Sequence, residues 1–337
     1  MKFVCNRCGK EREGKELFCR SCGGYFVPAI DERFSMNLKE NFPYIEEWFS
    51  LGEGNTPIIY DDAIFKLEFL SPTLSYKDRG SVTLISSLLK YLKEKNIKRI
   101  NEDSSGNAGA SIAAYGARAG LEVHVYVPEN ANEFKIKFIE SYGAKVHKIK
   151  GNRNDVTNAA KNADGFFASH ILNPEFRDGM RMISYEIFLA LKDPIPRIFV
   201  PVSAGTLLLG LIYGFRHLHK SGIIEKMPEI VAAQTEQVSP LCHALKGENY
   251  NPPEMITSVA DALVSTSPIL LDEMLKYMKG QDCVIVNENE IIESRRILLR
   301  KGLSVEYSSA VTYAAFRKKD YTGDNIIILT GHGIKSI

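Results

Sequence analysis

The chain has 337 residues, 45% of them hydrophobic and 25% charged, which predicts a globular α/β protein and excludes disordered, collagen-like and small disulfide-rich chains. Lysine and arginine total 42 against 41 aspartates and glutamates, a net charge of +1, so no overall field favours nucleic acid or anionic lipid. The first residues lack a signal-peptide pattern, and no apolar run reaches the roughly 18 residues that cross a bilayer. We therefore expect a cytoplasmic protein with neither a membrane nor a nucleic-acid partner.

Four of the six cysteines lie at the start of the chain, in two Cys-x-x-Cys pairs: Cys5, Cys8, Cys19 and Cys22. Each pair can form a knuckle that presents two thiolates to one ion, and two knuckles complete a tetrahedral structural zinc site. Gly9 and Gly23 follow the second cysteine of each pair, where a knuckle needs a left-handed residue. The pattern predicts a zinc ribbon over residues 1–28, although whether metal fills it stays open.

The remaining cysteines and the charge of the ribbon have simpler interpretations. Residues 1–26 carry six basic and three acidic side chains, an excess that solvated surface explains better than RNA binding. Cys242 and Cys283 stand alone far along the chain, and we expect both to be buried small apolar side chains rather than nucleophiles.

After a linker expected over residues 29–50, β-rich stretches alternate with amphipathic segments. The expected strands are Lys98–Asn101, Leu121–Val127, Ala144–Lys150, Gly165–Ser169, Arg197–Val202, Glu229–Gln234, Cys283–Val286 and Asn325–Thr330. The expected helices include Val82–Lys95, Ala108–Arg118, Asn132–Tyr142, Asp178–Leu191 and Leu207–Arg216. This alternation predicts parallel sheets covered on both faces, with functional residues in the loops that follow the strands.

Two strand-to-helix loops have the small polar residues of an anion site. Ser104–Gly109 opens an expected helix, so its free N–H groups and the helix dipole favour a carboxylate, although an ordinary N-cap explains the loop about as well. Pro201–Thr206 offers similar amides to a phosphate. It matches neither the P-loop nor the Gly-x-Gly-x-x-Gly fingerprint, which argues against an ATPase or a nicotinamide-dependent dehydrogenase.

Lys77 lies in the segment Ser75–Gly80, at the start of another expected helix. The helix dipole and desolvation both disfavour an ammonium there, as suits a lysine that forms a Schiff base. An ordinary helix start with solvated charges is the alternative, and composition alone favours it.

Five motifs in chain order resemble those of threonine synthase and, more widely, of the fold-type-II pyridoxal-phosphate (PLP) enzymes related to the tryptophan synthase β chain. They are Leu51–Pro57, Ser71–Gly80, Ser105–Asn107, Asn173–Gly179 and Leu329–Lys335. The resemblance runs from about Leu51 to the end of the chain, and an N-terminal cysteine ribbon also occurs on some members. It implies a large PLP-binding domain (51–94 and 181–337) and an inserted small mobile domain (95–180) that carries the asparagine loop.

The resemblance also implies a role for individual residues. Lys77 would form the Schiff base with PLP and then act as the base, and Asn107 would bind the phenolic oxygen of the cofactor. Thr330 would face the pyridine nitrogen. The cofactor phosphate would lie against Val202, Ser203, Ala204, Gly205 and Thr206. The candidate substrate contacts are Ser104, Ser105, Gly106, Ala108, Arg79, Arg177 and Arg181, the arginines because they suit a substrate phosphate.

The sequence departs from the family pattern mainly around the substrate. Leu74 stands where glycine is usual, Ala108-Gly109 where threonine-serine is usual, and His170-Ile171 and Met180-Arg181 where polar pairs are typical. Tyr307 also replaces a proline. Because pocket polarity decides which side chain is accepted, the cofactor is better defined than the substrate.

The expected activity is that of a homodimeric threonine synthase, a carbon–oxygen lyase of amino-acid biosynthesis that converts O-phosphohomoserine and water to threonine and phosphate. One alternative keeps PLP and changes the reaction, to a serine/threonine dehydratase or a β-replacement enzyme using phosphoserine. Another is a catalytically silent PLP-fold protein whose ribbon binds RNA or a protein, which the small ribbon charge and the intact Lys77 disfavour.

Overall fold

The computed structural model describes residues 2–30 and 32–336. Its strands are β1 (Lys2–Cys5), β2 (Phe26–Ala29), β3 (Ile58–Tyr60), β4 (Ile64–Leu67), β5 (Arg99–Glu102), β6 (Glu122–Pro128), β7 (Lys145–Ile149), β8 (Phe166–Phe167), β9 (Arg197–Pro201), β10 (Ile230–Thr235), β11 (Asp282–Val286) and β12 (Asn325–Leu329). Its α-helices are α1 (Lys77–Glu94), α2 (Asn107–Arg118), α3 (Glu133–Glu140), α4 (Arg153–Asn162), α5 (Pro174–Gly179), α6 (Arg181–Leu191), α7 (Thr206–Lys220), α8 (Pro240–Lys246), α9 (Leu271–Met278), α10 (Glu288–Arg300) and α11 (Tyr307–Lys318). Two 3₁₀ helices, η1 (Leu38–Asn41) and η2 (Gly333–Ser336), complete the set. Within the described ranges, no helix is both long and apolar enough to span a bilayer.

The chain divides into two compact units. Unit 1 comprises Met1–Asp31, Ser35–Gly54 and Ser71–Gly179, and unit 2 comprises Glu32–Phe34, Asn55–Leu70 and Met180–Ile337. The segment that carries Lys77 belongs to unit 1, because α1 packs on α2 and α5. The domain limits expected from the sequence instead assign this segment to the large domain. Those limits stay a prediction.

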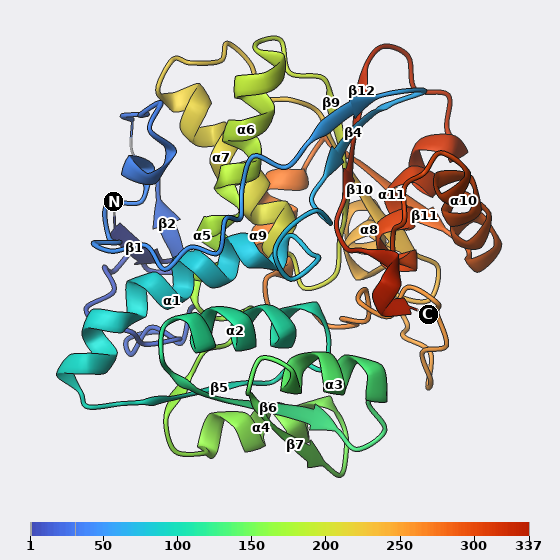
Figure 1. The fold of residues 1–337 in the computed structure, drawn as a ribbon. Coiled ribbons are helices and arrows are strands. Elements are labelled where there is room, and N and C mark those ends of the chain that lie inside the picture. Colours follow the sequence, from blue (N-terminus) through green and yellow to red (C-terminus); the bar gives the residue numbers. More distant parts are fainter. Residues whose placement is uncertain (1, 31, 337) are drawn as a thin grey trace. The chain divides into compact units, whose positions relative to one another are not determined.

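Unit 1 contains a parallel sheet in the order β7-β6-β5-β8. Helices α2 and α3 lie on one face and α4 on the other (Figure 1). The apolar stripe expected on α1 is buried, with Leu84, Ile85 and Leu88 inaccessible to solvent. Burial of a helix stripe at this spacing fixes the rotation of α1 about its axis, and therefore the direction of its first residues.

The N-terminal ribbon of unit 1 is held on the rest of the unit by buried charges. Strands β1 and β2 pair antiparallel, and the segment between them carries Arg12 and Lys15. Both donate to Oε1 of Glu175 in α5, over 2.8 and 2.7 Å. Because Glu175 and Arg12 are almost fully buried, this contact is a buried ion pair and not a surface one.

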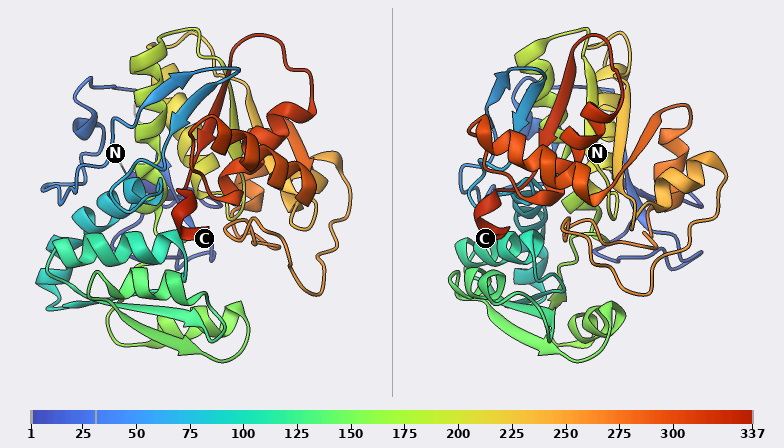
Figure 2. Two further views of the ribbon diagram at one scale, coloured as in Figure 1. Left: turned by 45° about the vertical axis from the view of Figure 1, so that its right-hand side comes forward. Right: turned by 90° about the vertical axis from the view of Figure 1, so that its right-hand side faces the viewer.

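Unit 2 is built on a six-stranded sheet in the order β11-β10-β9-β12-β4-β3, parallel except for the edge strand β3. Helices α10 and α11 lie side by side on one face, and α6 and α7 lie on the other (Figures 1 and 2). The core between α11 and the sheet is continuous and apolar, including Phe65, Phe199 and Ile327. Strands β9 and β12 are neighbours, so the loops after them open at one edge of the sheet.

All eight expected strands are present, with ends shifted by at most two residues. The helix expected over Asp178–Leu191 is instead two helices, α5 and α6, separated at Met180. The short strands β3 and β4 were not expected, because they lie in a segment without clear alternation. The expectation that Cys242 and Cys283 are buried small apolar side chains is wrong in part. Cys242 is buried, but Cys283 is only half-buried, and α8 and β11 bring the two together in a disulfide.

Candidate active site and metal centre

Lys77 is the first residue of α1 and is partly exposed. Its Nζ lies 4.6 Å from the centre of the Tyr76 ring. The turn before it is fixed by Asp78, which accepts hydrogen bonds from the backbone N–H and hydroxyl of Thr73 and from the hydroxyl of Ser111 in α2. A buried carboxylate with three donors holds the start of α1 in one conformation, so the lysine backbone is fixed while its side chain is half-buried, with the amine near the Tyr76 ring.

Leu74 explains why glycine is usual at its position in the family. Its φ is +63°, in the left-handed region where a side chain with a Cβ costs roughly 1–2 kcal/mol. The turn is therefore kept in this chain although Leu74 carries the Cβ that glycine lacks.

The asparagine loop joins β5 to α2 in unit 1. Residues 104–107 are partly exposed, and α2 begins at Asn107. Gly106 N–H donates to the hydroxyl of Ser104, over 3.3 Å. A Cβ on Gly109 would lie 1.9 Å from the carbonyl oxygen of Ser104, so the loop packs directly on the helix and the usual serine cannot replace this glycine without a shift.

Two acidic residues immediately before this loop were not selected from the sequence. Glu102 ends β5, and its Oε1 lies 2.6 Å from Nδ1 of His170, which follows β8. Burial raises the pKa of Glu102 to about 8, against the opposing effect of Arg153 and Lys77. Burial, with the positive charge of Lys77, lowers the pKa of His170 to about 3. Adjacent acidic residues at the end of a buried strand are the sequence signal that could have identified this pair.

Asp103, the next residue, is anchored by α4. Its Oδ2 accepts hydrogen bonds from Arg153 over 3.0 Å and from Thr157 over 2.6 Å, and Arg153 also donates to its carbonyl oxygen. Oδ1 of Asp103 and Oε2 of Glu102 are buried without a hydrogen-bond partner. Glu102, Asp103 and His170 can each direct one ligand atom to within 4.8 Å of the others, the arrangement of a possible cation site.

The motif Asn173–Gly179 forms α5 and its approach, and several of its residues contact other segments of unit 1. The Asn173 amide donates to the carbonyls of Phe167 and Ser169. A Cβ on Gly179 would lie 2.1 Å from the carbonyl oxygen of Arg79, so α5 meets α1 without a gap. Arg177 is fully buried and donates to Phe26 and Ile171 carbonyls, which uses two of its donors.

The other two candidate arginines are also fully buried. Arg181, in α6 of unit 2, donates to the hydroxyl of Tyr185 over 2.5 Å. Arg79 lies in α1 of unit 1. A substrate phosphate at any of the three arginines stays a prediction.

In unit 2 the small-residue loop after β9 leads into α7. Gly205 is the residue before the helix, with φ +94°, and a Cβ there would lie 2.6 Å from the sulfur of Met274. Only glycine fits both requirements. The first N–H groups of the 15-residue α7 have no partner within the helix and point toward its start, as an anion site requires.

Thr330 follows β12, the neighbour of β9, and is nearly buried. Its N–H donates to the hydroxyl of Ser309 over 2.7 Å. The next residue, Gly331, approaches Glu306 so closely that a Cβ would lie 2.3 Å from its carboxylate. The parallel pairing of β9 and β12 therefore brings the two predicted cofactor elements of unit 2 to the same edge of one sheet.

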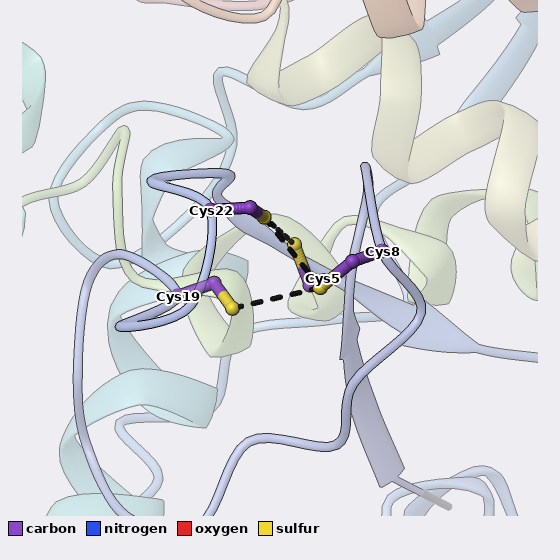
Figure 3. A group of neighbouring side chains, drawn as sticks. All are labelled: Cys5, Cys8, Cys19 and Cys22. Atoms are coloured by element: carbon purple, nitrogen blue, oxygen red, sulfur yellow. Dashed lines mark hydrogen bonds between the residues drawn. The ribbon is translucent and has the colours of Figure 1, made fainter.

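The four N-terminal cysteines converge as the sequence predicts (Figure 3). Sulfur separations are 3.3 Å for Cys5–Cys22, 3.5 Å for Cys8–Cys22 and 3.7 Å for Cys8–Cys19. A tetrahedron with metal–sulfur bonds of about 2.3 Å has sulfurs roughly 3.8 Å apart, so the set fits zinc after a small expansion.

The knuckles and thiol acidities also suit a metal. Gly9 and Gly23 have φ of +71° and +70°, as expected. Hydrogen bonds, first from the Ser21 N–H, lower the pKa of Cys19 to about 6. The Gly24 N–H also acts to lower the pKa of Cys22, but the neighbouring sulfurs raise it to about 12. Hydrogen bonds also lower the pKa of Cys5, so two of the thiols lose their protons more readily than Cys22, and a cation is needed to stabilise all four thiolates.

The fold and these loops define an α/β enzyme with candidate residues at the carboxyl ends of parallel strands. The family model described as "Pyridoxal-phosphate dependent enzyme" matches residues 49–331, and the chain belongs to this family. The chain is 28% identical to the threonine synthase of Methanocaldococcus jannaschii, covering 98% of this chain and 92% of that protein. It is also 28% identical to the threonine synthase of Methanosarcina acetivorans, with 98% and 91% covered.

Solved structures show the same fold. A pyridoxal 5'-phosphate-dependent aspartate racemase superposes with a TM-score of 0.71 at 24% identity, covering 82% of this chain and 90% of the other. The chain is therefore a threonine-synthase-like PLP enzyme of fold type II, as its motifs predict.

Proposed function

We propose that this protein is a threonine synthase, which converts O-phosphohomoserine and water to threonine and phosphate. The observation that carries the proposal is Lys77, a half-buried lysine held at the start of α1 by Asp78, in a chain that is similar to threonine synthases along nearly their whole length. Bound PLP supplies an electron sink for the substrate carbons.

Each residue of the proposal has a physical task. The Lys77 amine attaches the cofactor and then takes and returns protons at the substrate carbons. The N-terminal amides of α7 and the loop 202–206 bind the cofactor phosphate, which Gly205 lets approach closely. Thr330 offers a hydroxyl to the pyridine nitrogen, and Asn107 offers an amide to the phenolic oxygen.

The loop Ser104–Ala108 binds the substrate carboxylate in this proposal, because it ends at the N-terminus of a 12-residue helix. The four-cysteine ribbon binds structural zinc, as its sulfur spacing supports. A homodimer and a cytoplasmic location remain expectations.

The test is the absorbance of the Schiff base. Purified protein with added PLP should show the band, and Lys77→Ala should abolish it, whereas Lys90→Ala on the same helix should keep it. Phosphate release from O-phosphohomoserine should exceed ammonia release from serine or threonine. A colourless wild-type protein would refute PLP binding at Lys77, and preferred ammonia release would indicate a dehydratase.

A further inference from the structure

The two strands that end at Glu102 and His170 are parallel neighbours, β5 and β8, so their carboxyl ends meet. The ladder continues one step past β8, since the Ala168 N–H donates to the Asn101 carbonyl over 2.7 Å. This geometry brings the Glu102 carboxyl and the His170 imidazole to 2.6 Å, with both side chains removed from water. The His170 ring packs edge-to-face with the Phe176 ring, with the two ring centres 5.9 Å apart, and this contact fixes the orientation of the imidazole.

Because both side chains are buried, the charged form of each is disfavoured, which raises the pKa of Glu102 and lowers that of His170. Near pH 7 this burial favours a protonated carboxyl beside a neutral imidazole. A neutral carboxylic acid donates to Nδ1 of His170, so the pair contains no formal charge. The groups that act on it from surrounding elements are Lys77 of α1, Arg153 of α4 and the carboxylate of Asp103.

A proton explains the pair better than a divalent cation does. The three side chains have suitable ligand atoms, but Arg153 already binds the Asp103 carboxylate, and the positive charge of Lys77 acts on both members of the pair. A divalent cation would add two positive charges beside the existing charges of Lys77 and Arg153.

We propose that the Glu102–His170 pair is a positioning element of the asparagine loop, and that its proton is what allows the loop to accept the carboxylate of an amino-acid substrate. The inference rests on the proposed function of that loop. Glu102 lies two residues before Ser104, and Asp103 between them is fixed by Arg153 and Thr157. The loop therefore has little freedom to move away from a charge that appears at Glu102.

When Glu102 loses its proton, a buried negative charge forms beside a loop that must bind an anion. Its Oε2 has no hydrogen-bond partner, and the backbone N–H groups of His170 and Asp103 offset the effect of burial only in part. The charge repels the substrate carboxylate and opposes the dipole of α2. Substrate binding should therefore weaken as pH rises through the range in which Glu102 ionises, while proton transfer by Lys77 need not change.

Glu102→Gln tests this directly, because a glutamine amide donates to Nδ1 as the protonated acid does and cannot ionise. From pH 7.5 to pH 9.5 the KM of the wild type for O-phosphohomoserine should rise, and this rise should be about tenfold larger than the rise in Glu102→Gln over the same range. At pH 7 the two proteins should have the same KM within about twofold, with similar kcat. Glu122→Gln, an exposed glutamate on the neighbouring strand β6, is the control and should behave as the wild type.

A second readout needs no activity. The folded-state pKa of Glu102 is raised above its ordinary value of 4.5. The wild type should thus lose stability relative to Glu102→Gln as pH rises from about 4.5 to about 8, since the unfolded state releases the proton first. Urea denaturation of the full chain measures the difference.

The outcomes separate the two proposals. If the stability difference appears but neither protein turns over O-phosphohomoserine, the proposed function fails, and with it the role in binding this substrate. If the wild type is active and Glu102→Gln shows the same rise in KM, the positioning role is overturned. A requirement for added Mn²⁺ that Glu102→Gln removes would also overturn it, in favour of a metal site.

Discussion

Glu175 gives the sharpest test of how the ribbon is held. Its carboxylate is 1% exposed and accepts hydrogen bonds from both Arg12 and Lys15, whose side chains are 2% and 17% exposed. Burial alone would raise the pKa of Glu175, but the two cations lower it to about 2. Relative to the ordinary 4.5, that difference corresponds to about 3 kcal/mol in favour of the ionised form. Removing one partner of a buried pair costs a similar 3–5 kcal/mol.

We therefore expect Glu175→Gln to lower the free energy of unfolding by about 3 kcal/mol, because Arg12 and Lys15 remain buried beside a neutral amide. The thermal midpoint should fall by roughly 4 °C, because the entropy of unfolding grows with chain length. Circular dichroism during urea and thermal denaturation measures both, and Glu46→Gln, which removes an exposed pair with Lys90, should leave the midpoint unchanged.

The pH dependence of this effect has a definite sign. A carboxyl with a lowered folded-state pKa contributes stability above its unfolded pKa, and that contribution is lost as pH falls from about 4.5 toward 2. The difference between wild type and Glu175→Gln should therefore shrink over this range. A variant as stable as the wild type at pH 7, or a difference independent of pH down to 2, would show that the ion pair does not hold the ribbon.

Two further substitutions examine the cofactor loop and the ribbon. Gly205→Ala should destabilise the protein by more than Gly302→Ala. Both glycines have positive φ, so each substitution costs about 1 kcal/mol of backbone strain, but only a Cβ at position 205 would also clash with Met274. Gly205→Ala should also weaken PLP binding in an equilibrium titration, and equal effects of the two substitutions would refute the packing argument. Cys8→Ser should reduce bound zinc from about one ion per chain, measured by mass spectrometry of the metal, whereas Cys242→Ser should not.

The sequence alone determined the elements whose cause is local. Alternating strand and helix patterns predicted the parallel sheets, and the apolar stripe of α1 predicted the buried face of that helix. Two Cys-x-x-Cys pairs predicted four converging sulfurs, because spacing within a knuckle fixes where thiolates point. The order of five motifs identified the family, and the resemblance predicts the role of Lys77.

Only the tertiary structure decided contacts between segments that are distant along the chain. Nothing in the local pattern pairs Glu102 with His170, 68 residues later, because the contact depends on which strands become neighbours in the sheet. The disulfide between Cys242 and Cys283 depends on sheet order in the same way. Arg177 is a predicted phosphate ligand by residue type, and the fold gives it backbone carbonyl partners that its type does not reveal, one of them 151 residues away in β2. The charge and hydrogen-bonding capacity of a side chain can be read from its residue type. Which group it bonds to depends on the segments that the tertiary structure brings next to it.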